Sequence, residues 1–446
     1  MKLTSNGLKA AVVGALLLGL AGISTSSGAN GPSLEGLGLP AKFTGGELQA
    51  MDPARVRADA ADGSLTLTLL GRSYELSLSP APWDVDVGLA VPQADGSFQV
   101  TAPSFHNAAF VGRVAGEADS LATVLTVAEG VDGFVRVGAG TVYFEPMAFT
   151  SLGAPAGVSV VYRPDDVASP MLDFSNDEDV VETVEGVAPL PLPSLDEASH
   201  IPGPNRDLML WIDSAFWSLH GGISKAVSTF NQVNAFYSSS VGFTFNLVSN
   251  AVYICTDGTC DTTWGMTSTD AATLRNQWSD KVHNSCACPS FELAHLLSGK
   301  NLDGGTIGIS YLPGRYAISQ VRDESVYDGG SSDYESGLLM AHEVGHNFNG
   351  RHDRATSSTH YHPRTVCDLL VPVVNICLQS HTVYDAYTHY TTMWTPYSHE
   401  PSSYQEMPGT FSSTNYDYMR TCNSDDWTEG TFATVSNPTM GYWCNN

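Results

Sequence analysis

Three residues within one short stretch have the types and spacing of a metal site with an adjacent base. His342 and His346 are four positions apart, so a helix places both imidazoles on one side, close enough to bind a single tetrahedral zinc ion. Glu343 follows His342 directly, which puts a carboxylate beside a water molecule on that metal. The pattern indicates hydrolysis by an activated water molecule.

A third imidazole is available from His352. It reaches the same metal only if the chain turns back sharply after the helix, and Asn349 and Gly350 tolerate the left-handed backbone of such a turn. Three neutral imidazoles leave zinc one open position, as in a catalytic rather than a structural site. Asp353 is assigned to holding the local structure and not to the chemistry.

The helix that must position these ligands is signalled upstream. Ser332 and Glu335 have the spacing of a capping box, which predicts a helix start at this point. Small and apolar residues then recur every three or four positions, namely Leu338, Ala341, Gly345 and Phe348. This stripe predicts a helix that packs one side on the core and carries the ligands on the opposite side.

The segment from His342 to Asp353 resembles the metzincin zinc metalloproteases, and its opening His-Glu-Val-Gly-His-Asn-Phe looks most like the reprolysin or ADAM-type (adamalysin, M12B-like) branch. One departure is Asn349, which stands where the family usually has Gly. By the same resemblance, Met393 is the methionine that supports the metal from below, with Met407 and Met419 as competing candidates. The family implies one catalytic Zn²⁺, and the sequence leaves open whether structural Ca²⁺ also binds.

The predicted fold class is mixed α+β: a β-rich prodomain followed by a metzincin-type zincin domain with a mixed sheet, long helices, an active-site helix, a Met-turn and a C-terminal helix. The predicted parts are a signal peptide at 1–29, a β-rich propeptide-like domain at 30–163, a Pro-rich acidic linker at 164–205 and the protease domain at 206–446. The order of weak motifs between Ser104 and Pro146 resembles the reprolysin propeptide. The alternative for this part is an independent β-sandwich adhesion domain.

Within the protease domain, alternation and apolar runs predict a series of strands and helices. Strands are expected at 207–213, 243–247 continuing into 251–254, and 316–321, helices at 222–237 and 269–281, and a helix-to-strand passage from 291–300 into 305–311. The family implies an antiparallel edge strand in this last region that pairs with an extended substrate. His295 is expected to be structural, and the segment from His352 to Met393 is expected to be an inserted loop.

Eight cysteines lie in the second half of the chain, an even number that suits disulfides in an oxidising compartment. They are Cys255, Cys260, Cys286, Cys288, Cys367, Cys377, Cys422 and Cys444. Cys255 with Cys260 and Cys422 with Cys444 are plausible local pairs, and a second zinc cluster is the alternative. Together with the signal peptide, whose apolar run is too short to span a bilayer, the cysteines predict secretion without a stable membrane anchor.

The net charge of −27 disfavours a nucleic-acid partner. The sequence therefore predicts a secreted zinc endopeptidase that acts on proteins or peptides and has its own propeptide as an intramolecular inhibitor. No cysteine precedes Cys255, so a thiolate blocking the zinc is not expected. Cleavage in the linker, at a new N-terminus within about 185–206, is expected to release the enzyme, because an exposed linker is a favoured site for proteolysis. The alternative function is a secreted adhesion or binding protein with a non-catalytic metzincin-like domain.

Overall fold

The computed structural model describes residues 34–167 and 205–348, except for 35, 84–85, 94, 103–107, 139, 152, 241–242, 312–313 and 324–328. Beyond these it describes only the backbone of 357–371, 376–390 and 405–406. We call residues 34–167 the N-terminal unit and residues 205–348 the catalytic unit, since the latter contain the helix on which the sequence predicts the catalytic residues. The predicted signal peptide, most of the linker and the predicted C-terminal helix lie outside the described residues.

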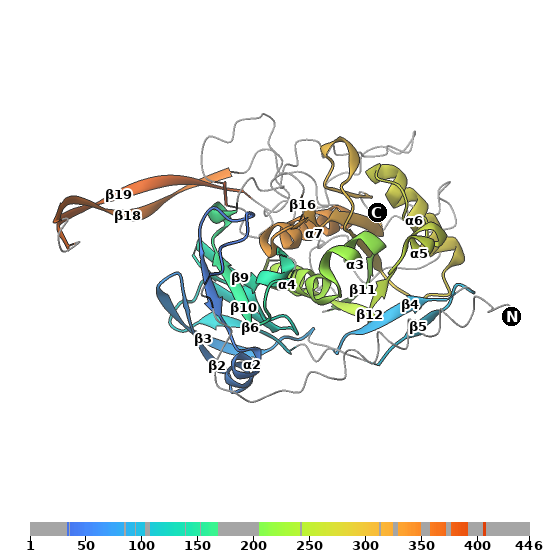
Figure 1. The fold of residues 1–446 in the computed structure, drawn as a ribbon, viewed down its shortest axis with the longest axis horizontal. Coiled ribbons are helices and arrows are strands. Elements are labelled where there is room, and N and C mark those ends of the chain that lie inside the picture. Colours follow the sequence, from blue (N-terminus) through green and yellow to red (C-terminus); the bar gives the residue numbers. More distant parts are fainter. Residues whose placement is uncertain are drawn as a thin grey trace, which may run out of the picture.

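The N-terminal unit is built mainly from an eight-stranded antiparallel sheet, in the order β1-β10-β9-β8-β7-β6-β3-β2 (Figure 1). Its strands are β1 Glu47–Ala50, β2 Ser64–Leu69, β3 Arg72–Pro80, β6 Ala108–Val114, β7 Ser120–Thr126, β8 Val131–Val137, β9 Gly140–Pro146 and β10 Val158–Tyr162, and helix α2 Pro53–Ala61 packs against β2 and β3. Exposed and buried residues alternate along β2, as the sequence predicts for a strand with one face on a core. The β-rich character expected for this part is confirmed.

The catalytic unit is organised around a seven-stranded mixed sheet, in the order β14-β15-β13-β11-β12-β4-β5. Its strands are β4 Gly88–Pro92, β5 Phe98–Val100, β11 Asn205–Ile212, β12 Thr244–Ile254, β13 Leu293–Ser298, β14 Gly308–Ser310 and β15 Tyr316–Gln320. The inner strands are parallel, and the edge strands β14 and β5 are antiparallel to their neighbours. A two-stranded ladder, β16 Arg322–Asp323 with β17 Gly329–Gly330, precedes the last helix of the unit.

Helices cover both faces of this sheet. They are α3 Ser214–His220, α4 Ser224–Ser240, α5 Gly258–Thr263, α6 Ala271–Ser285 and α7 Asp333–Asn347. Leu208 and Leu210 of β11 belong to the same core as α4 and α7, whereas Met209 and Trp211 belong to a second core with α6. The predicted mixed α+β class is therefore confirmed. The chain carries no helix in its described residues that is long and apolar enough to span a bilayer.

The expectation for residues 291–300 is wrong. Residues 291–300 were expected to begin as a helix, but Leu293–Ser298 is the strand β13, fully buried between β11 and β15. A strand covered on both faces has no alternation of polar and apolar residues, so its apolar run has the same appearance in sequence as a buried helix. The strand expected at 243–254 is present as β12, with Ser249 and Asn250 at φ of 57° and 47°.

Two strands of the N-terminal unit belong to the sheet of the catalytic unit. β4 pairs in parallel with β12, through Gly88 with Ala251 and Ala90 with Tyr253, and β5 then pairs with β4. Figure 1 shows these two blue strands beside β12, away from the sheet that contains β9 and β10. The predicted domain boundaries remain predictions, but the two parts of the chain share one sheet.

The expected inserted loop between His352 and Met393 contains a long hairpin. β18 Ser357–Val371 pairs antiparallel with β19 Ile376–Tyr390, and β20 Gln405–Glu406 adds to β19 (Figure 1). The expectation of irregular structure in this segment is therefore wrong for the backbone of both strands. The sequence of these strands is polar and rich in histidine, so it lacks the alternation of apolar and polar residues that predicts a strand. A two-stranded ribbon does not pack on a core and therefore does not need an apolar face.

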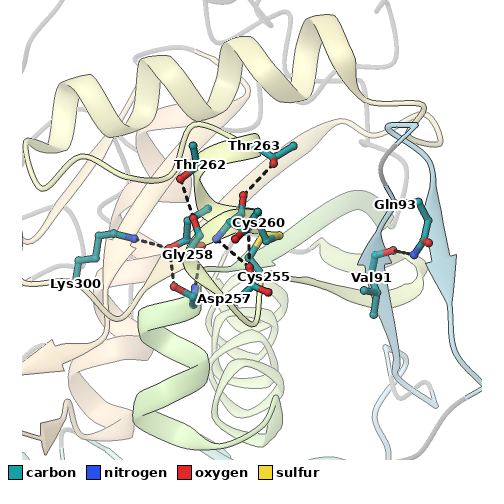
Figure 2. The surroundings of a disulfide bond; sticks show 12 residues. Val91, Gln93, Cys255, Asp257, Gly258, Cys260, Thr262, Thr263 and Lys300 are labelled. Carbon is teal, nitrogen blue, oxygen red and sulfur yellow. Dashed lines mark hydrogen bonds and ion pairs between the residues drawn. A yellow bond between two sulfur atoms is a disulfide. The ribbon is translucent and has the colours of Figure 1, made fainter. Parts of the chain in front are cut away.

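In the described part of the chain, two disulfides join cysteines that are close in sequence. Cys255 is bonded to Cys260, as predicted, and Cys286 is bonded to Cys288. Figure 2 shows the first of them beside Asp257, whose side chain accepts the backbone N–H groups of Thr259 and Cys260 at the start of α5. The backbone positions of Cys367 and Cys377 fall on β18 and β19, whereas Cys422 and Cys444 lie outside the described residues.

Candidate active site

Helix α7 begins at the residue that the sequence predicts. Ser332 is the N-cap, its Oγ accepts the Glu335 N–H at 3.3 Å, and the Glu335 carboxylate accepts the Ser332 N–H at 2.8 Å. The predicted capping box is therefore present. The helix ends at Asn347, with Phe348 as its C-cap.

The two histidines of α7 converge. His342 and His346 have their Nε2 atoms 3.0 Å apart, with the imidazole rings nearly perpendicular and their centroids 4.7 Å apart. Glu343 lies on the same helix, next to His342 in sequence. The structure thus brings two of the three predicted metal ligands together and places the predicted base on the same element.

The side of α7 that carries the predicted ligands is buried as well as the side with the apolar stripe. His342 and Glu343 have no solvent exposure and His346 has 4%. Helix α4 packs against α7, and β14 and β15 also contact it, so the helix is covered on the side opposite the core as well. A stripe identifies the side that must be buried, but it does not identify what covers the rest of the helix.

The end of α7 is fixed to the hairpin of β14 and β15. The Asn347 side-chain amide donates to the carbonyl oxygens of Tyr311 at 3.0 Å and Tyr316 at 3.3 Å, and the Gly314 N–H donates to the Asn347 carbonyl at 3.2 Å. β14 is an edge strand of the described sheet and is antiparallel to β15, as expected for the substrate-binding strand. The helix with the histidines and this edge strand therefore form one connected structure.

Gly308 of β14 lies directly against the predicted base. A Cβ atom added to Gly308 would stand 2.8 Å from Cδ and 2.9 Å from Cγ of Glu343, and would also meet a carboxylate oxygen. The position therefore accepts only glycine while Glu343 keeps its place. Sequence reasoning placed Gly308 in a strand and did not assign it a role at the site. A Gly at the start of an edge strand that faces the active-site helix is the signal that was available.

Tyr237 of α4 supports the helix beside the first histidine. Its buried hydroxyl donates to the carbonyl oxygen of Ala341 at 3.0 Å, and burial holds the pKa of Tyr237 well above its usual value, so the group is a neutral donor. Sequence reasoning included Tyr237 only as the end of a helix. The contact is between residues 104 positions apart, which local patterns do not reveal.

We expect Tyr237→Phe to lower the free energy of unfolding by about 1 kcal/mol, because it removes a buried hydrogen bond with little change in shape. Tyr316→Phe is the matched control, since the Tyr316 hydroxyl is buried without a hydrogen-bond partner among the described residues. Urea unfolding of both variants measures the difference. Equal losses for the two variants would contradict a supporting role for the Tyr237 hydroxyl.

Several predicted site residues lie outside the described residues: His352, Asn349, Gly350, Asp353 and Met393. Within the described part of the chain, no group of three or more His, Cys, Asp or Glu side chains is arranged to hold a metal. His295, predicted to be structural, is buried in β13 with Nε2 3.0 Å from the Ser319 Oγ. Burial lowers the pKa of His295 to about 3, which keeps this imidazole neutral.

Comparisons with known proteins agree with the motif. Residues 205–401 match the model of metallo-peptidase family M12, and this match begins where β11 begins. Among solved structures, metalloproteinase-II from Bacteroides fragilis is similar at 11% identity and a TM-score of 0.35, over 65% of this chain and 81% of that one. Archaemetzincin from Methanopyrus kandleri is similar at 17% identity and a TM-score of 0.23, over 34% and 77% of the two chains. The match of residues 205–401 to metallo-peptidase family M12 confirms the metalloprotease resemblance that the motif predicts.

Proposed function

We propose that this chain is a secreted zinc-dependent endopeptidase that hydrolyses peptide bonds of protein substrates, with His342, His346 and His352 as its metal ligands. The observation that carries the proposal is the convergence of His342 and His346 on α7 beside Glu343, within a segment that matches a metallopeptidase family. Asn349, Gly350, Asp353 and Met393 are proposed to support this site.

The donor set suits zinc. Two imidazoles on one tetrahedral Zn²⁺, at Zn–N distances of about 2.0–2.1 Å, have nitrogen atoms about 3.3 Å apart. The 3.0 Å between the Nε2 atoms of His342 and His346 is close to this separation, so both rings need only a small adjustment. When bound, Zn²⁺ supplies Lewis acidity for a substrate carbonyl and for water.

Glu343 is proposed as the general base. Its carboxylate takes a proton from the attacking water molecule and passes it to the leaving amine, a role that requires a carboxylate within hydrogen-bond reach of that water. The contact between Glu343 and Gly308 supports this role, because it holds the carboxylate beside the edge strand β14. A substrate that adds to β14 as a further strand has its main chain bound along this edge and its scissile bond near Glu343.

Secretion and synthesis as a zymogen complete the proposal. The order of charged, apolar and small residues in 1–29 supports export, and the disulfides Cys255–Cys260 and Cys286–Cys288 suit an oxidising compartment. We place the activating cleavage in the linker 164–205, with a mature N-terminus within about 185–206, because an exposed Pro-rich stretch is a favoured site for proteolysis. Before that cleavage, the propeptide and linker keep the enzyme latent.

Casein or gelatin hydrolysis by the purified mature protein tests the proposal. We expect cleavage that a chelator abolishes and that added Zn²⁺ restores, because the metal is required for catalysis. Metal content measured on the same samples links the loss to the metal. Mature protein that holds zinc and cleaves neither substrate would favour a non-catalytic binding protein.

A further inference from the structure

The first turn of the active-site helix is capped by the N-terminal unit. A helix leaves its first N–H groups without partners in the helix itself. In α7, the Asp333 N–H donates to the Glu145 carboxylate of β9, and the Tyr334 N–H donates to the Tyr162 hydroxyl of β10 at 3.2 Å. The Tyr162 hydroxyl also donates to Glu145 at 2.9 Å. Two amides of this helix therefore depend on side chains about 170–190 positions earlier in the chain.

Buried charges cross the same boundary. Lys42 of the N-terminal unit lies 2.7 Å from a Glu335 oxygen, and neither side chain is exposed at all. Lys225 of α4 is paired with Asp333 in equally buried surroundings, and Glu145 adds a second carboxylate beside them. Removing one partner of a buried ion pair is strongly destabilising, because an uncompensated charge stays behind. Loss of the N-terminal unit would take Lys42 away from Glu335.

Apolar contacts join the two units over a wide area. Phe134 of β8 packs against Phe236 of α4 at 5.5 Å between ring centroids, and the Trp83 indole N–H donates to Asn231 of α4 at 2.8 Å. On the far side of the sheet, Phe98 of β5 packs against Trp211 and other aromatic rings of the second core. These rings belong to hydrophobic cores to which both units contribute residues. The two units are therefore packed together as in a protein interior.

These contacts lie far from the proposed metal ligands along the helix. The polar contacts above fall on the first turn of α7, at Asp333, Tyr334 and Glu335. His342 and His346 follow Asp333 by nine and thirteen residues, which corresponds to about 14 and 20 Å of helix. The N-terminal unit can therefore hold the start of α7 while the other end carries out the reaction.

We infer that the N-terminal unit stays bound to the catalytic unit after the linker is cut, as a permanent partner that holds the active-site helix and not as a released inhibitor. The inference rests on the proposed cleavage of the linker, but not on the proposed catalysis. Activation then depends on the cut itself and not on departure of the folded N-terminal unit.

The test uses the full chain with Glu343→Gln, so that it is independent of the chain's own activity, and a recognition sequence for a site-specific protease inserted between Val187 and Pro193. After complete cleavage, denaturing electrophoresis shows two fragments. We expect size-exclusion chromatography with light scattering to show one species with the mass of the uncleaved chain. Elution of the N-terminal fragment as a separate species would overturn the inference.

Lys42→Met in the same cleaved protein tests the buried pair. We expect the dissociation constant of the two fragments to rise by about 100-fold or more, because Glu335 loses its buried partner. Arg55→Met is the matched control, since Arg55 pairs with Asp59 on the surface of the same unit at 81% side-chain exposure. Analytical ultracentrifugation over a dilution series measures both. Equal effects of the two substitutions, or none, would show that the pair does not hold the units together. If Lys42→Met does not fold, the unsubstituted cleaved protein still decides the inference.

Association of the fragments is expected to weaken as the pH rises from about 5 to about 8. Burial first, and then the charge of Asp333, raises the pKa of Glu145 to about 8, while burial raises the pKa of Asp132 well above its usual value. Burial alone would lower the pKa of Lys225, but Asp333 and Glu145 outweigh it. In the associated state, the carboxyl groups of Glu145 and Asp132 therefore hold protons that they release when the fragments separate. This proton binding stabilises the complex at low pH, and the stabilisation is lost as the pH rises through the raised pKa of Glu145. Tyr162, also in contact with Glu145, is a neutral donor in this range because burial raises its pKa as well.

Glu145→Gln should weaken this dependence in the same ultracentrifugation series, because the amide keeps an oxygen acceptor and does not titrate, whereas Asp132 still does. Glu117→Gln is the control, since Glu117 is half-exposed on the surface of the N-terminal unit. An unchanged pH dependence in Glu145→Gln would overturn the role of this carboxylate at the boundary.

Discussion

Glu343→Gln is expected to lower kcat/KM for a peptide substrate by about 10²–10⁴-fold, the range that a positioned general base contributes. Glutamine has nearly the shape of glutamate, so it keeps the packing against Gly308 but accepts no proton from water. Since His342 and His346 are untouched, zinc content should be unchanged. The loss should therefore fall on kcat, because the interaction that is removed acts in the transition state.

The measurement is steady-state kinetics with a peptide substrate, accompanied by zinc analysis and thermal unfolding. Asp280→Asn on α6 is the control, because it removes an exposed carboxylate in the catalytic unit without approaching α7. Full activity of Glu343→Gln would refute the general-base role. Loss of zinc together with activity would instead show that Glu343 supports the metal ligands.

The sequence predicts the active-site helix well because its information is local. The capping box at Ser332 and Glu335 and the four-residue spacing of His342 and His346 depend on residues within one helix, and both are present in the structure. The alternation in β2 and β3 is local in the same way. Such features depend little on the rest of the fold, since the geometry of a single helix or strand sets them.

Features that depend on distant segments are not predictable in this way. His342 and Glu343 are buried on a helix that contacts α4, β14 and β15, and the first-turn amides of α7 are satisfied from β9 and β10. The sequence predicts a helix where strand β13 lies, because burial on both faces removes the alternation of a strand. The pairing of β4 with β12 joins residues about 160 positions apart and leaves no local pattern.

The shared interior also limits how the chain can be divided. Composition separates an N-terminal β-rich part, a linker and a protease part, and this division follows from where cysteines, prolines and acidic residues lie. The structure adds that Lys42 and Glu335 form one buried pair across the division. The boundary in composition is where we propose that the chain is cut, and the buried pair is one of the contacts from which we infer that the two pieces stay together.

Gly308→Ala should lower kcat/KM by about 10–100-fold with little change in zinc content, since displacement of a catalytic group by about 1 Å is enough for losses of this size. The added methyl group occupies space that the Glu343 carboxylate fills, and a flexible side chain yields more easily than the edge strand β14. The carboxylate therefore moves while the fold and the histidines stay. Gly222→Ala is the control, because a Cβ at Gly222 meets no atom within 4 Å. Steady-state kinetics, metal analysis and thermal unfolding of both variants show whether the loss of activity comes from displacement of Glu343 and not from loss of zinc or of the fold. If Gly308→Ala kept full activity, Glu343 would not act from the position seen against β14, and the proposed placement of substrate along that strand would lose its support.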